Sequence, residues 1–101
     1  MVQDYDKALE DARRKLLDAT RSNLDALVDS GYKGVIDLGF EIAGGYAIRY
    51  TLSNGHICRN RTSGPFAEVT ADKVPFHRYT GDRLRIVAEN IEKALEGRKR
   101  E

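Results

Sequence analysis

The chain has 101 residues, 33% of them charged, and its 17 Lys and Arg residues nearly balance its 16 Asp and Glu residues. This length suits one domain, and the net charge of +1 excludes, on global charge, a strongly basic nucleic-acid protein and an acidic nucleic-acid mimic. A single cysteine excludes an intrachain disulfide, and no apolar run has the length of a signal or membrane-spanning segment. We therefore expect one cytoplasmic domain over residues 1–101, without membrane contact.

The N-terminal segment predicts a long amphipathic helix. Asp4 is a favourable N-cap residue and Gly31 a natural stop. Between them, apolar residues recur at helical spacing among densely charged ones. The apolar residues are Tyr5, Leu9, Ala12, Leu16, Leu17, Leu24, Leu27 and Val28.

As one continuous helix, residues 4–30 would be about 40 Å long, whereas a seven-residue strand spans about 23 Å. Two alternatives follow from this mismatch. In the first, the helix breaks at residues 20–23, where Ser22 would cap a second segment with Asp25 three residues later. In the second, the N-terminal turns project from the domain, and Tyr5 and Leu9 pack on a partner or on a second copy of the chain.

Residues 35–52 predict two strands that alternate apolar and polar residues. A three-residue loop at 43–45 would keep the apolar residues of both strands on one face, whereas a two-residue Gly44-Gly45 turn would split them between faces. We therefore predict the longer loop. The expected pairs are Ile42 with Tyr46, Phe40 with Ile48, Leu38 with Tyr50, and Ile36 with Leu52.

Asn54 and Gly55 predict a second hairpin, because both residues tolerate the positive φ of a type I′ turn. The expected pairs are Ser53 with His56, Leu52 with Ile57, and Tyr50 with Arg59. The resulting meander has an apolar face for the core and a polar face, which also carries Cys58, free to meet a partner. This polar face is the first candidate binding site: Asp37, Glu41, Arg49, Thr51, His56 and Asn60.

Residues 62–79 carry a weaker pattern. We expect a short fourth strand at 66–70, a turn at 71–73 and an extended segment at 74–79. Val74 and Phe76 would dock on the core, and Pro65 and Pro75 exclude a long helix and favour edge or loop positions.

The last helix would begin after Thr80 as its cap, with Asp82 in the first turn, and end at Gly97, leaving 97–101 as a frayed tail. Both helices need the same apolar sheet face. The sequence therefore predicts an α+β fold, a two-layer sandwich in which the N- and C-terminal helices pack on one face of an antiparallel three- to four-stranded meander.

His56, Cys58 and Asn60 alternate on one strand and are the residue types of a papain-like site. Alternate strand residues lie about 7 Å apart at Cα, which opposes a hydrogen bond between thiol and imidazole. No helix N-terminus is placed by the sequence to lower the pKa of the thiol. The pattern thus favours a polar strand face with an inert cysteine.

Asp37 and Glu41 lie beside Arg49 on the polar face, which predicts cross-strand charge pairing rather than acid-base catalysis. The two histidines, His56 and His77, have no further ligands at metal-binding spacing. We therefore expect no catalytic residue, no metal site and no cofactor.

Residues 45–85 carry seven Lys and Arg against three Asp and Glu. Arginines beside aromatic residues such as Tyr50 bind phosphates and stack on bases. The predicted register places Arg59 and Arg61 on the apolar face. Either the N-terminal helix leaves that edge open, or the aliphatic parts of both side chains pack there while their guanidinium groups extend to water. This basic rim is the second candidate site: Arg59, Arg61, His77, Arg78 and Arg83.

The function that these features favour is a non-enzymatic protein-interaction module, of the kind found among small accessory and inhibitor proteins of phages and mobile elements. It would bind a protein partner, or a second copy of itself, through the polar sheet face and the N-terminal helix. The alternative is a nucleic-acid-binding domain that uses the basic rim. A cysteine-dependent enzyme centred on Cys58 is a third hypothesis.

Overall fold

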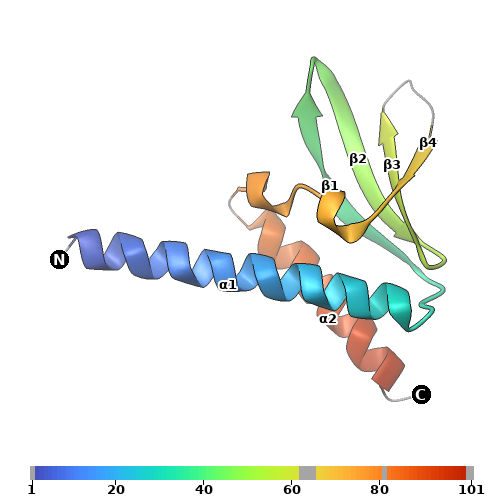
Figure 1. Ribbon diagram of the computed structural model, residues 1–101, viewed down its shortest axis with the longest axis horizontal. Coiled ribbons are helices and arrows are strands. Elements are labelled where there is room, and N and C mark those ends of the chain that lie inside the picture. The colour runs from blue at the N-terminus through green and yellow to red at the C-terminus, as the bar shows by residue number, and fades with distance from the viewer. Residues whose placement is uncertain (1, 62–65, 81, 100–101) are drawn as a thin grey trace.

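The computed structural model describes residues 2–61, 66–80 and 82–99 of the chain. A long helix, α1 (Val2–Asp29), is followed by four strands, two short 3-10 helices and a second long helix (Figure 1). The strands are β1 (Val35–Ala43), β2 (Tyr46–Ser53), β3 (His56–Arg61) and β4 (Phe66–Val69). The 3-10 helices are η1 (Ala71–Lys73) and η2 (Phe76–Arg78), and the second helix is α2 (Arg83–Lys99).

The strands form one antiparallel sheet in the order β1-β2-β3-β4, which confirms the predicted α+β fold and its meander. Chain order equals spatial order because each strand pairs with the strand that follows it. The two helices and the two 3-10 helices lie at one end of the sheet (Figure 1). Side chains from all these parts form one core, which includes Leu24, Leu27, Leu38, Leu52, Phe76, Tyr79, Leu84 and Ile91.

The hairpin between β1 and β2 does not have the predicted three-residue loop. Its turn contains only Gly44 and Gly45, and a β-bulge interrupts the ladder between Asp37 and Gly39. Before the bulge, Ile36 pairs with Leu52 as predicted. After it, the register differs from the prediction in every pair: Phe40 with Arg49, Glu41 with Ile48, Ile42 with Ala47, and Ala43 with Tyr46.

The bulge exchanges the faces of the distal end of β1. The extra residue allows the two-residue turn without moving the buried residues Ile36 and Leu38 out of the core. Phe40 and Ile42 therefore lie on the outer face, opposite to the core, and Glu41 lies on the inner face. The sequence prediction was wrong for these three residues.

Gly39 adopts a φ of +97°, a conformation that residues with a side chain rarely adopt. Its N–H donates to Asp37 Oδ1 at 2.9 Å. The Tyr79 ring lies so close that a Cβ on Gly39 would come within 2.9 Å of it. Tyr79 also donates its hydroxyl hydrogen to the Leu38 carbonyl oxygen at 2.6 Å, so the phenol fixes the bulge from the core side.

The second hairpin has the predicted register, with Ser53 opposite His56 and the other two expected pairs present. Asn54 and Gly55 have φ values of +51° and +87°, as a type I′ turn requires. The expected fourth strand is also present, as β4, and it pairs with β3.

Helix α1 is continuous, so the alternative with a break at residues 20–23 is wrong. Thr20 is buried, and its hydroxyl donates to the Leu16 carbonyl oxygen at 2.6 Å within the helix, which satisfies this polar group without ending the helix. Gly31, with a φ of +74°, follows the last turn as predicted. The helix begins at Val2, two residues before the expected cap, Asp4.

The C-terminal third agrees with the prediction in its buried residues and differs in its backbone. Val74 and Phe76 are fully buried in the core. The expected extended segment instead contains η2, because the Arg78 N–H donates back to the Pro75 carbonyl oxygen at 2.9 Å. Helix α2 begins at Arg83 rather than directly after Thr80.

Helix α2 also continues past Gly97 to Lys99, so the prediction that the helix ends at Gly97 was wrong. The other positions of the expected tail, 100–101, lie outside the described residues, as does Pro65.

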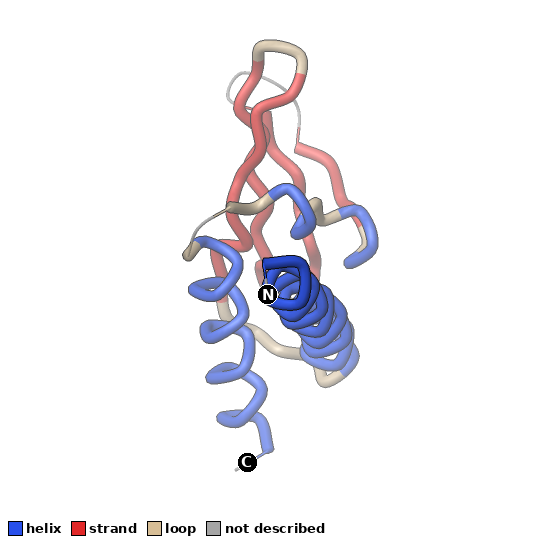
Figure 2. Tube along the Cα trace, turned by 90° about the vertical axis from the view of Figure 1, so that its left-hand side faces the viewer, coloured by secondary structure: helices blue, strands red, loops and turns tan. Residues whose placement is uncertain are grey.

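The molecule is flat, with extents of 46 × 42 × 18 Å. Figure 2 shows that the end of the sheet with the β1-β2 turn stands clear of both helices. Helix α1 is about 42 Å long and extends beyond the domain at its N-terminus (Figure 1). The structure therefore leaves two parts without a covering layer: the far end of the sheet and the first half of α1.

Candidate functional site

The uncovered end of the sheet, which we call the distal sheet, comprises residues 40–49, 59–61 and 66–67. Its outer face carries one row of side chains that crosses all four strands. Phe40 pairs with Arg49, Arg49 with Asn60, and Asn60 with Phe66. Because directly opposed residues share a face, these four side chains lie side by side on the outer face.

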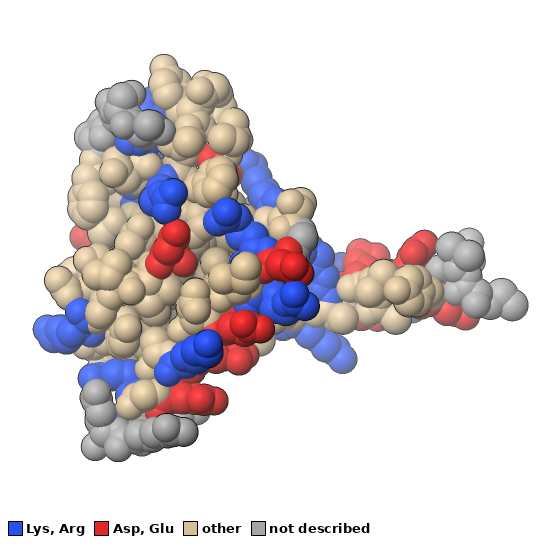
Figure 3. Space-filling model, turned by 180° about the vertical axis from the view of Figure 1, so that it is seen from behind, with Lys and Arg blue, Asp and Glu red and all other residues tan. Residues whose placement is uncertain are grey.

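The outer row has an aromatic residue at each edge, and both are accessible. Phe40 is 37% exposed and Phe66 is 68% exposed. Ile42, also 68% exposed, extends the apolar surface toward the β1-β2 turn, where it pairs with Ala47. Seen from behind, this end of the molecule is largely uncharged, with scattered basic side chains (Figure 3).

Two arginines contribute positive charge to this face, Arg49 within the outer row and Arg83 from α2 beside it. Arg49 forms an ion pair with Asp37 at 2.9 Å, which holds its side chain on the sheet. Arg83, at the start of α2, places its guanidinium 4.5 Å from the centre of the Phe40 ring, at cation-π distance. A hollow of about 330 Å³ lies between Phe40, Ala47, Arg49, Asn60 and Arg61.

Five of the six residues of the predicted polar face lie together on the outer face as expected: Asp37, Arg49, Thr51, His56 and Asn60. The exception is Glu41, which the bulge turns to the inner face. His56 Nδ1 lies 2.8 Å from Glu68 Oε1, so its ring is already paired with a neighbouring strand. Phe40, Ile42 and Phe66 were not among the predicted site residues, although Gly39 inside a strand indicates a bulge.

Glu41 is the centre of a polar cluster on the inner face. Its Oε1 accepts a hydrogen bond from the Tyr50 hydroxyl, and its Oε2 pairs with Arg78 Nη1, both at 2.8 Å. Burial, and secondly the Glu41 carboxylate, which favours the protonated phenol, together raise the pKa of Tyr50 to about 12. Glu41 is thus bound to two partners on the inner face.

The predicted basic rim is divided by the structure. Arg59 and Arg61 lie on the inner face, where they line a hollow of about 380 Å³ with Ile48 and Ala67. The Arg61 guanidinium lies 4.6 Å from the centre of the Tyr46 ring. Arg78 pairs with Glu41 and Arg83 stacks on Phe40, and these two arginines line a separate hollow of about 320 Å³ at the edge of β1.

His77 is the remaining residue of the predicted rim, and its side chain is exposed in η2. The His77 carbonyl oxygen, on the backbone, accepts a hydrogen bond from the Arg13 guanidinium at 3.4 Å. No direct contact therefore joins His77 to Arg59 or Arg61 within the part of the chain that the structure describes.

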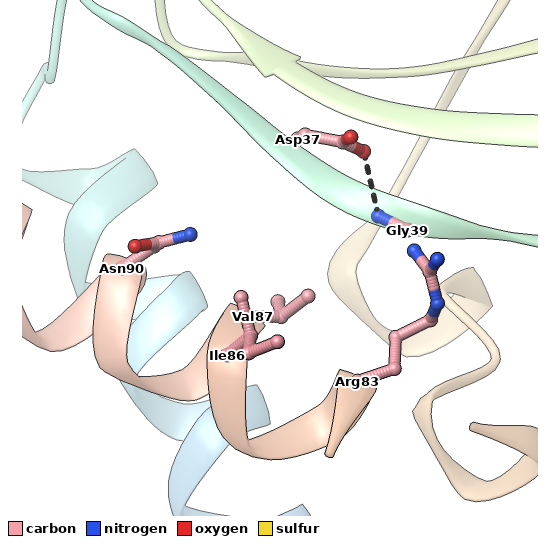
Figure 4. A pocket seen from close by; sticks show the side chains of 6 residues that line it. All are labelled: Asp37, Gly39, Arg83, Ile86, Val87 and Asn90. Atoms are coloured by element: carbon pink, nitrogen blue, oxygen red, sulfur yellow. Dashed lines mark hydrogen bonds between the residues drawn. The ribbon is translucent and has the colours of Figure 1, made fainter. Parts of the chain in front are cut away.

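A second hollow, of about 310 Å³, lies between the edge of β1 and α2 (Figure 4). Its polar lining consists of Asp37, Arg83 and Asn90. The Asp37 carboxylate already accepts from the Gly39 N–H and pairs with Arg49, and the lining has no thiol, hydroxyl or imidazole. The one group in this lining that could act as a nucleophile, the Asp37 carboxylate, is therefore already hydrogen-bonded and ion-paired.

Cys58 is buried and does not form a catalytic pair with His56. Its thiol lies 3.8 Å from the backbone carbonyl oxygen of His56, and the imidazole contacts Glu68 instead. Burial raises the pKa of the Cys58 thiol, and the nearby Glu68 carboxylate adds to this shift. Among the described residues, no group of three or more His, Cys, Asp and Glu side chains could hold a metal ion.

Comparisons of the chain with protein-family models, with curated proteins and with solved structures found no match. In the described part of the chain, neither helix combines the length and apolar character needed to cross a membrane. The candidate site therefore rests on geometry and chemistry alone.

Proposed function

We propose that this chain is a non-enzymatic protein-interaction module that binds a protein partner through the outer face of the distal sheet. The observation that carries the proposal is the outer row, in which two exposed phenylalanines frame Arg49 and Asn60 on an uncovered face. Exposed apolar surface of this kind marks interaction sites, since monomeric proteins rarely leave large contiguous patches open.

The composition of the site supports a protein partner. Aromatic residues and arginine are enriched at the centres of protein interfaces, where they supply most of the binding free energy. The ion pair between Arg49 and Asp37 and the stacking of Arg83 on Phe40 restrict these side chains before binding, which reduces the entropy that binding loses. Polar groups at the base of the face, including Thr51 and His56, would form the rim. An accessory or inhibitor protein is the function class that such a module serves.

The test is capture of partners from the source organism's lysate on immobilised protein, with and without nuclease treatment. Proteins that bind after nuclease treatment are then titrated against Phe40→Asp and Phe66→Asp. We expect each substitution to weaken binding by about tenfold or more, because it places a charge in the apolar contact.

The matched control is Val35→Asp, since Val35 is as exposed as Phe66, at 68%, but lies at the other end of β1. Val35→Asp should leave affinity unchanged. Equal affinity of Phe40→Asp, Phe66→Asp and the original chain for a captured protein would refute the assignment of the site. Loss of every captured protein with the nuclease would refute the protein-binding proposal itself.

A second candidate function, nucleic-acid binding, is favoured by one observation on the inner face. Arg59 and Arg61 line the same hollow, and neither has a carboxylate within ion-pair distance among the described residues. With Tyr46 stacked on Arg61, these groups would contact phosphates and bases. Affinity for single-stranded oligonucleotides should then fall steeply with salt and be lost in Arg59→Glu with Arg61→Glu. A flat salt response contradicts this function.

A further inference from the structure

The first half of α1 carries an apolar strip that the described part of the chain leaves uncovered except at its C-terminal end, where Leu16 packs against the core. Tyr5 is 66% exposed and Leu9 is 53% exposed. With Ala12, which is exposed, and Leu16, which is half-buried against the domain core, they recur at intervals of three and four residues, so all four lie along one side of the helix. In Figure 3 this part of α1 shows an uncharged strip bordered by acidic side chains. We call Tyr5, Leu9, Ala12 and Leu16 the α1 strip.

Charged residues border the α1 strip in a pattern that changes sign along the helix. Asp6 and Arg13 are two helical turns apart on one border, and Asp4 and Lys15 are three turns apart on the other. On each border the acidic residue precedes the basic residue. Asp4, Asp6 and Lys15 form no ion pair with any described residue.

Arg13 is held in place by the domain without being neutralised. Its guanidinium donates to the carbonyl oxygens of His77 and Tyr79, which lie beside α1. It has no carboxylate partner among the described residues. Because a guanidinium has five N–H donors, Arg13 retains donors for a further acceptor while its position remains fixed.

We propose that the chain forms a homodimer in which the α1 strips of two copies pack in antiparallel orientation. A two-fold axis near Leu9 would place Asp6 beside Arg13 of the second copy and Asp4 beside Lys15 of the second copy, with each pair repeated by symmetry. A parallel arrangement would bring the two acidic segments together at one end and the two basic segments together at the other. The order of charges along α1 therefore selects the antiparallel dimer.

The contact spans about four helical turns in each copy, which places the interface at the low end of specific interfaces, below about 1,200 Å². Such a dimer dissociates on dilution. The dimer does not depend on the proposed function, because the α1 strip and the outer row of the distal sheet are separate surfaces.

The test is sedimentation velocity of the full chain over a wide concentration range. The original chain should pass from monomer to dimer as concentration rises. Leu9→Asp should weaken the dimer by about tenfold or more, because each dimer contains this leucine twice. Circular dichroism of Leu9→Asp checks that α1 remains helical. Val35→Asp, which introduces the same charge at an exposed apolar position outside α1, and Phe40→Asp, in the outer row, should leave the dimer unchanged.

Charge exchange tests the antiparallel orientation. Asp4→Lys and Lys15→Asp should each weaken the homodimer, since each places like charges at both ends of the contact. The double variant, with both substitutions, should regain the original affinity. An equimolar mixture of the two single variants should form heterodimers more tightly than either variant forms homodimers. A chain that stays monomeric at every concentration, a dimer that Leu9→Asp leaves unchanged, or single variants that do not pair in the mixture would each overturn the proposal.

Discussion

Tyr50 donates its hydroxyl hydrogen to Glu41 Oε1 at 2.8 Å on the inner face of the sheet. This contact depends on the bulge in β1, because the predicted register without a bulge would place Glu41 on the outer face. Arg78 holds the second carboxylate oxygen at 2.8 Å, and the Glu41 side chain is only 12% exposed. The cluster therefore connects β1, β2 and the segment that leads into α2.

Substitution of Glu41 by alanine should lower the free energy of unfolding by about 1–3 kcal/mol, because the hydroxyl of the buried Tyr50 and the Arg78 guanidinium lose their acceptor. Urea denaturation monitored by circular dichroism measures the change. The control is Glu68→Ala, which removes an exposed carboxylate paired with His56 and should change stability by less than about 1 kcal/mol. Equal effects of the two substitutions would show that the inner cluster adds nothing to stability.

Gly39→Ala should be among the most destabilising single-methyl additions in this chain, at about 2–4 kcal/mol. The new Cβ would meet the Tyr79 ring at 2.9 Å, and φ is +97°. Gly44→Ala is the matched control, since its φ is +59° and nothing lies within 4 Å of the added Cβ. The control should cost only about 1 kcal/mol, from backbone strain. Thermal or urea unfolding of both variants measures the difference, and a Gly39→Ala variant no less stable than Gly44→Ala contradicts the bulge geometry.

Stability should fall in alkaline solution as pH rises from about 10 to about 12. Burial raises the pKa of Tyr50 to about 12 and also raises the pKa of Tyr79, whereas an unfolded tyrosine titrates near about 10. In this window the unfolded chain releases protons that the folded chain keeps, so deprotonation favours unfolding. Below about pH 10 the contribution of both groups is complete. Urea midpoints measured across the window should fall less steeply for Tyr50→Phe, and midpoints independent of pH would contradict the assignment.

Cys58 should react slowly with iodoacetamide at about pH 8 while the protein is folded. Cys58 is only 6% exposed, so the reagent has restricted access to the thiol. Burial raises the pKa of the thiol, and the Glu68 carboxylate adds to this shift, so little reactive thiolate is present. The rate should increase to that of an ordinary thiol such as glutathione when urea unfolds the chain. Mass spectrometry follows the alkylation. A folded-state rate above that of glutathione would revive the cysteine-dependent enzyme hypothesis.

The sequence predicted the fold well where local signals decide the structure. The Asn54-Gly55 turn fixed the β2-β3 register, because few residues other than these accept two successive positive φ values. Val74 and Phe76 were correctly placed in the core, since these apolar side chains follow the sheet and can fold back onto it. Short-range chemistry was sufficient in both cases.

The prediction failed where a distant residue decides the structure. The rule that one face must hold all apolar residues predicted the wrong β1-β2 register. The register depends on a bulge at Gly39, and the residue that packs on this bulge is Tyr79, forty residues later in the chain, which the local pattern does not show. The candidate site was therefore incomplete. Phe40 and Ile42 were expected in the core, and they are instead exposed on the outer face of β1.

Neither helix covers the distal sheet, whose contacts with the rest of the domain include the Glu41–Arg78 ion pair, the stacking of Arg83 on Phe40 and the packing of Ile48 against the core. The backbone amides of the distal sheet should therefore exchange with deuterium through local opening, at a free energy well below that of global unfolding, while amides paired over Leu38 and Leu52 exchange only when the whole domain unfolds. A partner that binds the outer row would order this end of the hairpin. Part of the binding free energy would then appear as slower amide exchange, and affinity would respond to changes at Gly44 and Gly45 that touch no partner.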